Sequence, residues 1–242
     1  MVFADLFFIY FFLPLCLICY FAAKKLETKN KVLIVFSLIF YAWGEPIWII
    51  LLLFSAAFNW IMGMHIGANR NKPRGKIFMA TAISVDILLL LIFKYTGFFA
   101  ETFNGIFHAS IPVPQIALPI GISFYTFQAI SYVLDCYWEN VKPQRQFSKF
   151  LLYLSLFPQL IAGPIVRYSV VEQEVSKRRV TATDLSEGAL RIIVGLAKKV
   201  IIANNLYAIV TQFFGQDIST LSTLGTWYTV IVYLSLIHIS EP

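Results

Sequence analysis

Long apolar runs separated by short polar segments extend along the whole chain. In the run Leu118–Trp138, polar residues recur at steps of three and four: Tyr125, Gln128, Tyr132 and Asp135. At about 3.6 residues per turn, this spacing predicts one polar face on an apolar helix of roughly membrane length. Burying an amide and a carboxylate in hydrocarbon costs several kcal/mol unless each finds a partner. We expect this face to line a wet cavity or to meet other polar helices, as a working surface or as packing between helices.

Seven further apolar segments complete the pattern. They are Val2–Ala23, Val32–Trp43, Ile47–Met64, Ile77–Phe93, Phe150–Val166, Leu190–Phe214 and Leu221–Ile239. A membrane span needs about 20 residues, so some of these segments are short. The pattern predicts an all-α polytopic membrane protein with about seven spans and one re-entrant hairpin.

The re-entrant hairpin is predicted at Phe150–Val166, because basic loops flank this segment on both sides. Pro158 and the pair Gly163-Pro164 interrupt a helix there. Broken backbone at membrane depth is tolerated only where protein covers it or where it lines a water-filled space. We therefore expect the hairpin to lie beside the polar face; an ordinary kinked span is the alternative.

The composition is 59% hydrophobic with a net charge of +6. The bases concentrate in the loops Lys24–Lys31, Arg70–Lys76 and Glu139–Lys149, whereas Gly44–Pro46 and Thr96–Ala117 hold none. This alternation is typical of membrane topology rather than of nucleic-acid binding. It predicts a multi-pass protein of the bacterial inner membrane with the basic loops in the cytoplasm and the N-terminus outside.

Thr183 or Asp184 is predicted to cap the next helix, with Glu187 completing a capping box. Arg191 and Lys198 share a face of that helix, and we expect anionic lipid headgroups as their partners.

The final residues 234–242 resemble translated sequencing-adapter read-through, so residues 1–233 are expected to form the native part of the domain.

Few residues of the sequence suggest a disulfide framework or a metal site. The three cysteines lie in apolar stretches without the spacing of a disulfide framework, and the three histidines have no partners at metal-ligand spacing. No metal and no tightly bound cofactor are expected.

Three motifs, in order and spacing, resemble the membrane-bound O-acyltransferase family. They are LPIGISFYTFQAISYVLDCY at Leu118–Tyr137, FPQLIAGPIVRY at Phe157–Tyr168 and GLAKKVIIANNL at Gly195–Leu206, with Phe40–Gly44 as an earlier match. Within the family they are most similar to the branch of alginate O-acetyltransferase and the D-alanyl-transfer protein of teichoic acids.

The resemblance implies a ring of helices around a tunnel, in which an acyl donor (acyl-CoA or an acyl carrier) meets an acceptor hydroxyl outside. Expected partners are membrane lipids, a polysaccharide or teichoic-acid-type acceptor, an acyl carrier protein and polymer-export proteins. The family's catalytic histidine stands in a Trp-His-Gly-type sequence that is not found here, so the chain is expected to be an inactive N-terminal fragment. The polar face, Gln159 and the bend Gly163-Pro164 are assigned to the tunnel. Arg167 is a candidate for the donor phosphates, or a topological anchor.

Two other functions fit the same pattern. A polar stripe beside a broken hairpin also suits a transporter or flippase for a small solute or lipid-linked sugar. Transporters often contain internal repeats, and the two halves of this chain show no convincing match. A noncatalytic partner in a polymer-export complex is the third possibility.

Overall fold

The structure is a computed structural model of the 242-residue chain and describes residues 5–70, 72–114, 116–160, 163, 165–215 and 222–240. The regular elements within these residues are all helices, as the sequence predicts. The chain divides into two compact units, one of Phe7–Arg178 and one of Arg179–Pro242 together with Val2–Leu6.

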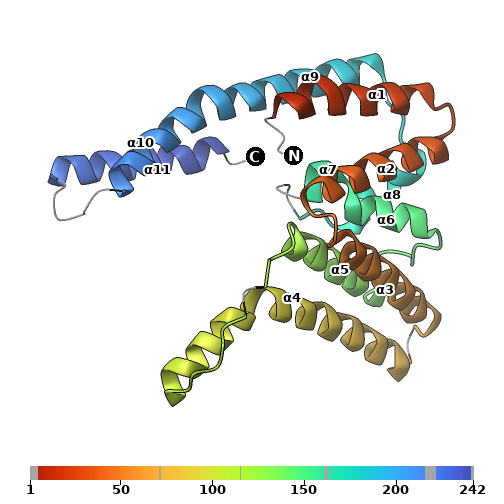
Figure 1. Ribbon diagram of the computed structural model, residues 1–242. Helices are drawn as coiled ribbons and strands as arrows, with labels where there is room; N and C mark the ends of the chain where they lie inside the picture. The colour runs from red at the N-terminus through yellow and green to blue at the C-terminus, as the bar shows by residue number, and fades with distance from the viewer. Residues whose placement is uncertain are drawn as a thin grey trace. The chain divides into compact units, whose positions relative to one another are not determined.

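The first unit is built around α5 (Figure 1). Its elements are η1 (Phe8–Phe12), α1 (Leu13–Ala22), α2 (Leu26–Gly44), α3 (Ile49–Ala68), α4 (Pro73–Phe107), α5 (Ile122–Tyr137), α6 (Phe147–Ser155), α7 (Phe157–Leu160) and α8 (Tyr168–Lys177). Helices α3, α4, α6 and α8 all pack against α5. The predicted polar helix is therefore enclosed by protein.

The second unit is a helical hairpin. Its elements are α9 (Ala182–Ala197), η2 (Lys198–Ala203), α10 (Asn204–Phe214) and α11 (Thr223–Ser240). The first three follow one another without a break, and α11 packs back against η2 and α10. Most of its described large apolar side chains, such as Ile193, Ile201 and Trp227, are exposed, as on a surface that lipid or further protein covers.

Within the described parts of the chain, three helices are long and apolar enough to cross a membrane: Ile49–Ala68, Pro73–Phe107 and the continuous run Ala182–Phe214. Shorter apolar helices cover Phe8–Ala22 and Thr223–Ile239. The helical membrane protein is thus confirmed, whereas seven spans and an external N-terminus stay predictions.

Several predicted boundaries are wrong. The expected loop Lys24–Lys31 is helical from Leu26, since its Glu and Lys residues are good helix formers. The expected outer loop after Thr96 stays in α4 until His108, which takes a left-handed conformation ahead of two prolines. Only then does the backbone leave the helix.

The capping prediction was wrong by two or three residues. Thr181 is the N-cap of α9; its hydroxyl accepts a hydrogen bond from the Asp184 backbone N–H at 3.2 Å, and the Asp184 carboxylate accepts from the Thr181 N–H at 2.8 Å. Asp184 therefore fills the acidic position of the capping box, and Glu187 instead pairs with Arg191 at 4.0 Å on an exposed face.

The segment predicted as a hairpin is broken and folds back on itself. Helix α6 ends at Ser155 and α7 starts at Phe157, before Pro158. The Phe157 N–H freed by this break donates to the Ser37 hydroxyl of α2 at 3.2 Å. Ser155 and Phe157, on either side of this break, are buried by protein, as broken backbone inside a membrane would require.

Candidate functional site

The polar face of α5 is buried within the first unit. Tyr125, Gln128, Tyr132 and Asp135 have exposed fractions of 1%, 0%, 0% and 4%. Ala129 and Val133 are buried beside them, whereas Phe127 on the opposite side is 46% exposed. The shared face predicted from the spacing is confirmed; the role of these residues in a tunnel stays a prediction.

The C-terminal half of this face holds the loop that follows the helix. The Asp135 carboxylate accepts a hydrogen bond from the Asn140 side-chain amide at 3.1 Å, and the Asp135 backbone carbonyl accepts the N–H groups of Asn140 and Val141. The Tyr132 hydroxyl accepts from the Gln144 N–H at 3.0 Å. These two side chains therefore position the loop 138–146.

The N-terminal half of the face adjoins two polar residues that the sequence analysis missed. The Asn59 amide of α3 donates to the Asp86 carboxylate of α4 at 2.9 Å, and Asp86 is only 1% exposed. Tyr125 lies near enough to interact electrostatically with Asp86 and Tyr41. The signal was present in the sequence, because Asp86 is an ionisable residue inside an apolar run.

Unpaired polar atoms gather in this half. Among the described residues, the Gln128 amide, the hydroxyls of Tyr125 and Tyr41 and one Asp86 carboxylate oxygen are buried without a hydrogen-bond partner. Each such group costs about 1–3 kcal/mol. These donors and acceptors are the groups in this half that an ordered water or a bound polar group could satisfy.

Tyr153 of α6 joins the polar face to the hairpin. Its hydroxyl lies 2.8 Å from the Val166 carbonyl and 3.3 Å from the Gln128 carbonyl, within hydrogen-bond reach of both. At the start of α5, a Cβ on Gly121 would stand only 2.7 Å from the Leu160 carbonyl oxygen. The segment Phe150–Val166 therefore lies beside the polar face, as expected, whereas its re-entrant course in the membrane stays a prediction.

The remaining predicted site residues lie at this hairpin. The Gln159 amide donates to the Tyr153 carbonyl, and Gly163 packs so closely that a Cβ there would stand 2.6 Å from the Gln159 Cα. Arg167 is exposed directly before α8. Pro164 lies outside the described residues.

Both histidines of the first unit are exposed. His65 stacks on Phe78 with ring centroids 5.0 Å apart, and His108 ends α4 in an exposed position. Within the described residues, no group of three His, Cys, Asp or Glu side chains could hold a metal ion. Amide, carboxylate and phenol groups can orient hydroxyl-rich substrates by hydrogen bonds.

Curated relatives match the chain over most of its length. It is 32% identical to the probable alginate O-acetylase of Pseudomonas aeruginosa, over 98% of this chain and 46% of that protein. It is 29% identical to the peptidoglycan O-acetyltransferase of Helicobacter pylori, over 93% of this chain and 49% of that protein. The teichoic acid D-alanyltransferase of Bacillus subtilis is 27% identical over 60% of this chain and 36% of its own length.

The chain spans about half the length of the curated relatives it matches. No family model and no solved structure matches it. The relatives nevertheless confirm the resemblance to the membrane-bound O-acyltransferase family, because the chain is homologous, over 98% of its own residues, to part of a bacterial alginate O-acetylase.

Proposed function

We propose that this chain is part of a bacterial inner-membrane enzyme that transfers an acetyl or similar short acyl group to hydroxyls of an exported polysaccharide or cell-envelope polymer. The observation that carries the proposal is the similarity to relatives whose names state alginate, peptidoglycan and teichoic acid as acceptors. The acceptors differ, whereas the transfer of a small acyl group is common to them.

Within such an enzyme, the chain supplies an orienting wall rather than the reacting base. Acyl transfer needs a base for the hydroxyl and donors for the oxyanion. The N-terminal half of the α5 face offers the Gln128 amide and the Tyr125 phenol as hydrogen-bonding groups for the acceptor. We assign the base to a histidine in sequence beyond this chain and the acyl group to a co-substrate, acyl-CoA or an acyl carrier.

The test is ester formation by the complete gene that contains this chain. The gene is expressed in a bacterium that exports an acetylatable polymer, and ester-linked acetyl per repeat unit is measured by NMR before and after mild alkaline hydrolysis. We expect alkali-labile acetyl above the empty-vector level. Unchanged ester content with the protein present in the membrane would contradict the proposal.

The alternative hypothesis, a transporter or flippase, is tested in the same cells. Inverted vesicles that carry the complete protein are compared with control vesicles for uptake of soluble sugars and movement of lipid-linked sugars across the bilayer. An acyltransferase leaves both rates at the control level, whereas faster movement without ester formation would favour the transporter.

A further inference from the structure

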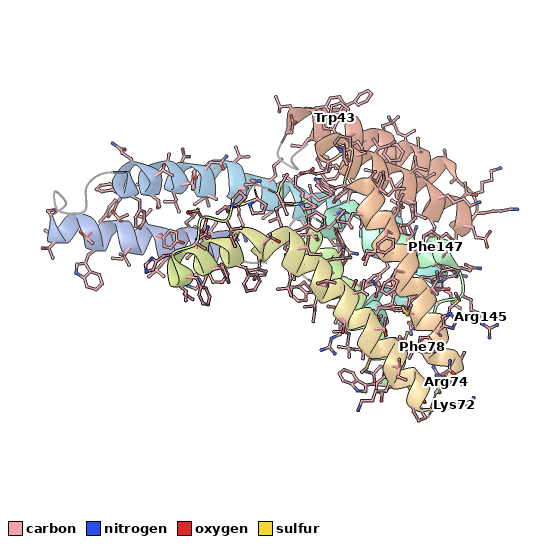
Figure 2. All side chains as sticks on the ribbon, turned by 60° about the horizontal axis from the view of Figure 1, so that its bottom comes forward. Trp43, Lys72, Arg74, Phe78, Arg145 and Phe147 are labelled. Atoms are coloured by element: carbon pink, nitrogen blue, oxygen red, sulfur yellow. The ribbon has the colours of Figure 1, made fainter. Side chains whose placement is uncertain are left out.

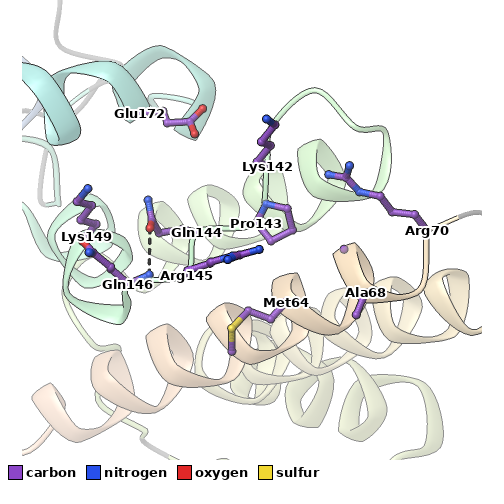
Figure 3. A pocket seen from close by; sticks show the side chains of 11 residues that line it. Met64, Ala68, Arg70, Lys142, Pro143, Gln144, Arg145, Gln146, Lys149 and Glu172 are labelled. Carbon is purple, nitrogen blue, oxygen red and sulfur yellow. Dashed lines mark hydrogen bonds between the residues drawn. The ribbon is translucent and has the colours of Figure 1, made fainter.

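A pocket of about 890 Å³ lies at the C-terminal end of α3, apart from the polar face of α5. Its wall is formed by the end of α3, the loop before α6 and the helices α6 and α8 (Figure 3). This volume falls in the range of about 300–1,000 Å³ that small-molecule sites occupy.

The lining is strongly basic. Arg70, Lys142, Arg145 and Lys149 face a single carboxylate, that of Glu172. No salt bridge joins any of these four bases to a carboxylate in the part of the chain that the structure describes. The loops predicted to share one side of the membrane thus meet here, and Figure 2 labels Arg145, Lys72 and Arg74 at the same end of the unit.

Arg70 contributes a half-buried guanidinium to the lining. Its Nε atom is buried, so the terminal N–H groups are the ones that a ligand in the pocket could reach. Figure 3 shows the Arg70 and Arg145 guanidinium groups on opposite sides of Pro143. A guanidinium presents its N–H donors in a rigid fork that matches phosphate oxygens, so each of the two arginines can bind an anionic group in a bidentate way.

The loop 138–146, which lines the pocket, is held in place chiefly by hydrogen bonds of Gln144. Its backbone carbonyl accepts the Trp60 indole N–H at 2.7 Å, and its N–H donates to the Tyr132 hydroxyl at 3.0 Å. Its side chain donates to the Tyr168 hydroxyl at 2.6 Å and accepts from the Gln146 N–H at 3.0 Å. Burial raises the pKa of Tyr168, so this hydroxyl stays protonated at neutral pH. Bases that served topology alone would need no such support.

Close packing forms the floor of the pocket. A Cβ on Gly67 of α3 would stand 2.2 Å from the Pro143 Cγ, so only glycine lets the loop approach α3 this closely. Lys142 and Arg145 on either side of Pro143 are thereby held against the end of α3.

We infer that this pocket binds a phosphate-bearing ligand through its arginines and lysines. Two sources share that chemistry: a soluble acyl donor that carries phosphates, which rests on the proposed function, and the headgroup of an anionic lipid. In the first case the pocket is the donor's docking site, and the bases act as positioning residues that do not touch the reacting atoms.

Coenzyme A is the probe for the soluble source. The chain is placed in phosphatidylcholine nanodiscs, and binding is measured by isothermal titration calorimetry. Arg70→Gln is expected to raise the Kd about tenfold or more, since a hydrogen bond to a charged group contributes about 1.5–3 kcal/mol. Arg167→Gln is the matched control, because it removes the same charge from an exposed position outside the pocket lining, and it should change the Kd less than about twofold.

Phosphatidylglycerol is the probe for the lipid source. Nanodiscs with an equal mixture of phosphatidylglycerol and phosphatidylcholine are compared by native mass spectrometry for lipid retained on the protein. Retention that Arg70→Gln abolishes and Arg167→Gln preserves, without coenzyme A binding, identifies the ligand as a lipid headgroup at the same phosphate site.

Gly67→Val tests the geometry with every charge kept, since it displaces Pro143. We expect weaker binding of whichever probe the wild type binds. Arg145→Gln provides a second charge variant should Gly67→Val fail to insert. The inference is overturned if neither probe binds, or if Arg70→Gln and Arg167→Gln weaken binding equally. The measurement involves no acyl transfer, so its failure is distinct from a failure of the proposed function.

Discussion

The buried carboxylate of Asp86 shows how much one hydrogen bond can matter at membrane depth. Its bond to the Asn59 amide links α3 to α4, the two long helices that pack against α5. A carboxylate so deeply buried is stable only with such a partner. The pair therefore joins the two helices that pack against α5, the helix that carries Tyr125.

A double-mutant cycle tests this pair. Asn59→Leu is expected to lower the free energy of unfolding by about 1–3 kcal/mol, because it leaves the Asp86 carboxylate without its donor. Asn59→Leu combined with Asp86→Leu should cost less than the sum of the single changes, since both polar groups are then gone. Thermal unfolding in detergent gives the values; strict additivity would show that the bond contributes little.

At the scale of elements, α5 is shorter than the sequence suggested. Its apolar run begins at Leu118, yet the helix starts only after Gly121, whose φ of 75° is left-handed. Pro119 and Gly121 provide this delay, and the sequence alone could not show that Leu160 would pack directly against the glycine. At about 1.5 Å per residue, the 16-residue helix is roughly 24 Å long, less than a bilayer core.

Gly121→Ala should destabilise the first unit by about 1–2 kcal/mol or more, through the left-handed backbone and the contact with the Leu160 carbonyl. Gly105→Ala is the control, because Gly105 is helical, exposed and without atoms within 4 Å of a built Cβ. It should be neutral or stabilise by up to about 1 kcal/mol. Equal unfolding midpoints for the two variants would contradict the described start of α5.

The hairpin prediction is tested by labelling. The Lys149 ammonium lies 3.3 Å from the Ser176 hydroxyl, so the beginning of α6 and the end of α8 are side by side. In a background with Cys16, Cys19 and Cys136 replaced by alanine, Lys149→Cys and Arg167→Cys should react with an impermeant maleimide from the same side of the membrane. Reaction from opposite sides would make the segment an ordinary span.

The sequence predicted the helical spacing of the polar residues well, but it did not predict their hydrogen-bond partners. The four-residue polar face follows from spacing alone, and the hairpin break follows from Pro158 and from basic loops on both sides. The roles of Tyr132 and Asp135 depend on where the loop after α5 returns, which no local pattern encodes. In the sequence, Tyr153 is one tyrosine within an apolar run, and no nearby residue indicates that its hydroxyl meets the Val166 carbonyl.

At the scale of the whole molecule, the chain contains an enclosed polar helix and a basic pocket, joined by the loop 138–146. Tyr132 contributes to the polar face and also supports the pocket loop through Gln144. A ligand that orders this loop can therefore influence the polar face directly. Asp135→Leu should for this reason lower both coenzyme A binding and acyl transfer.

The central claim is that the α5 face orients the acceptor in an acyltransferase. In the complete protein, Gln128→Leu should lower ester formation per folded molecule about tenfold or more, whereas Phe127→Leu on the exposed side should leave it nearly unchanged. Folded protein is counted by detergent-resistant monomer on size-exclusion chromatography. A loss of ester that merely follows the loss of folded protein, or equal activity of the two variants, would contradict the account.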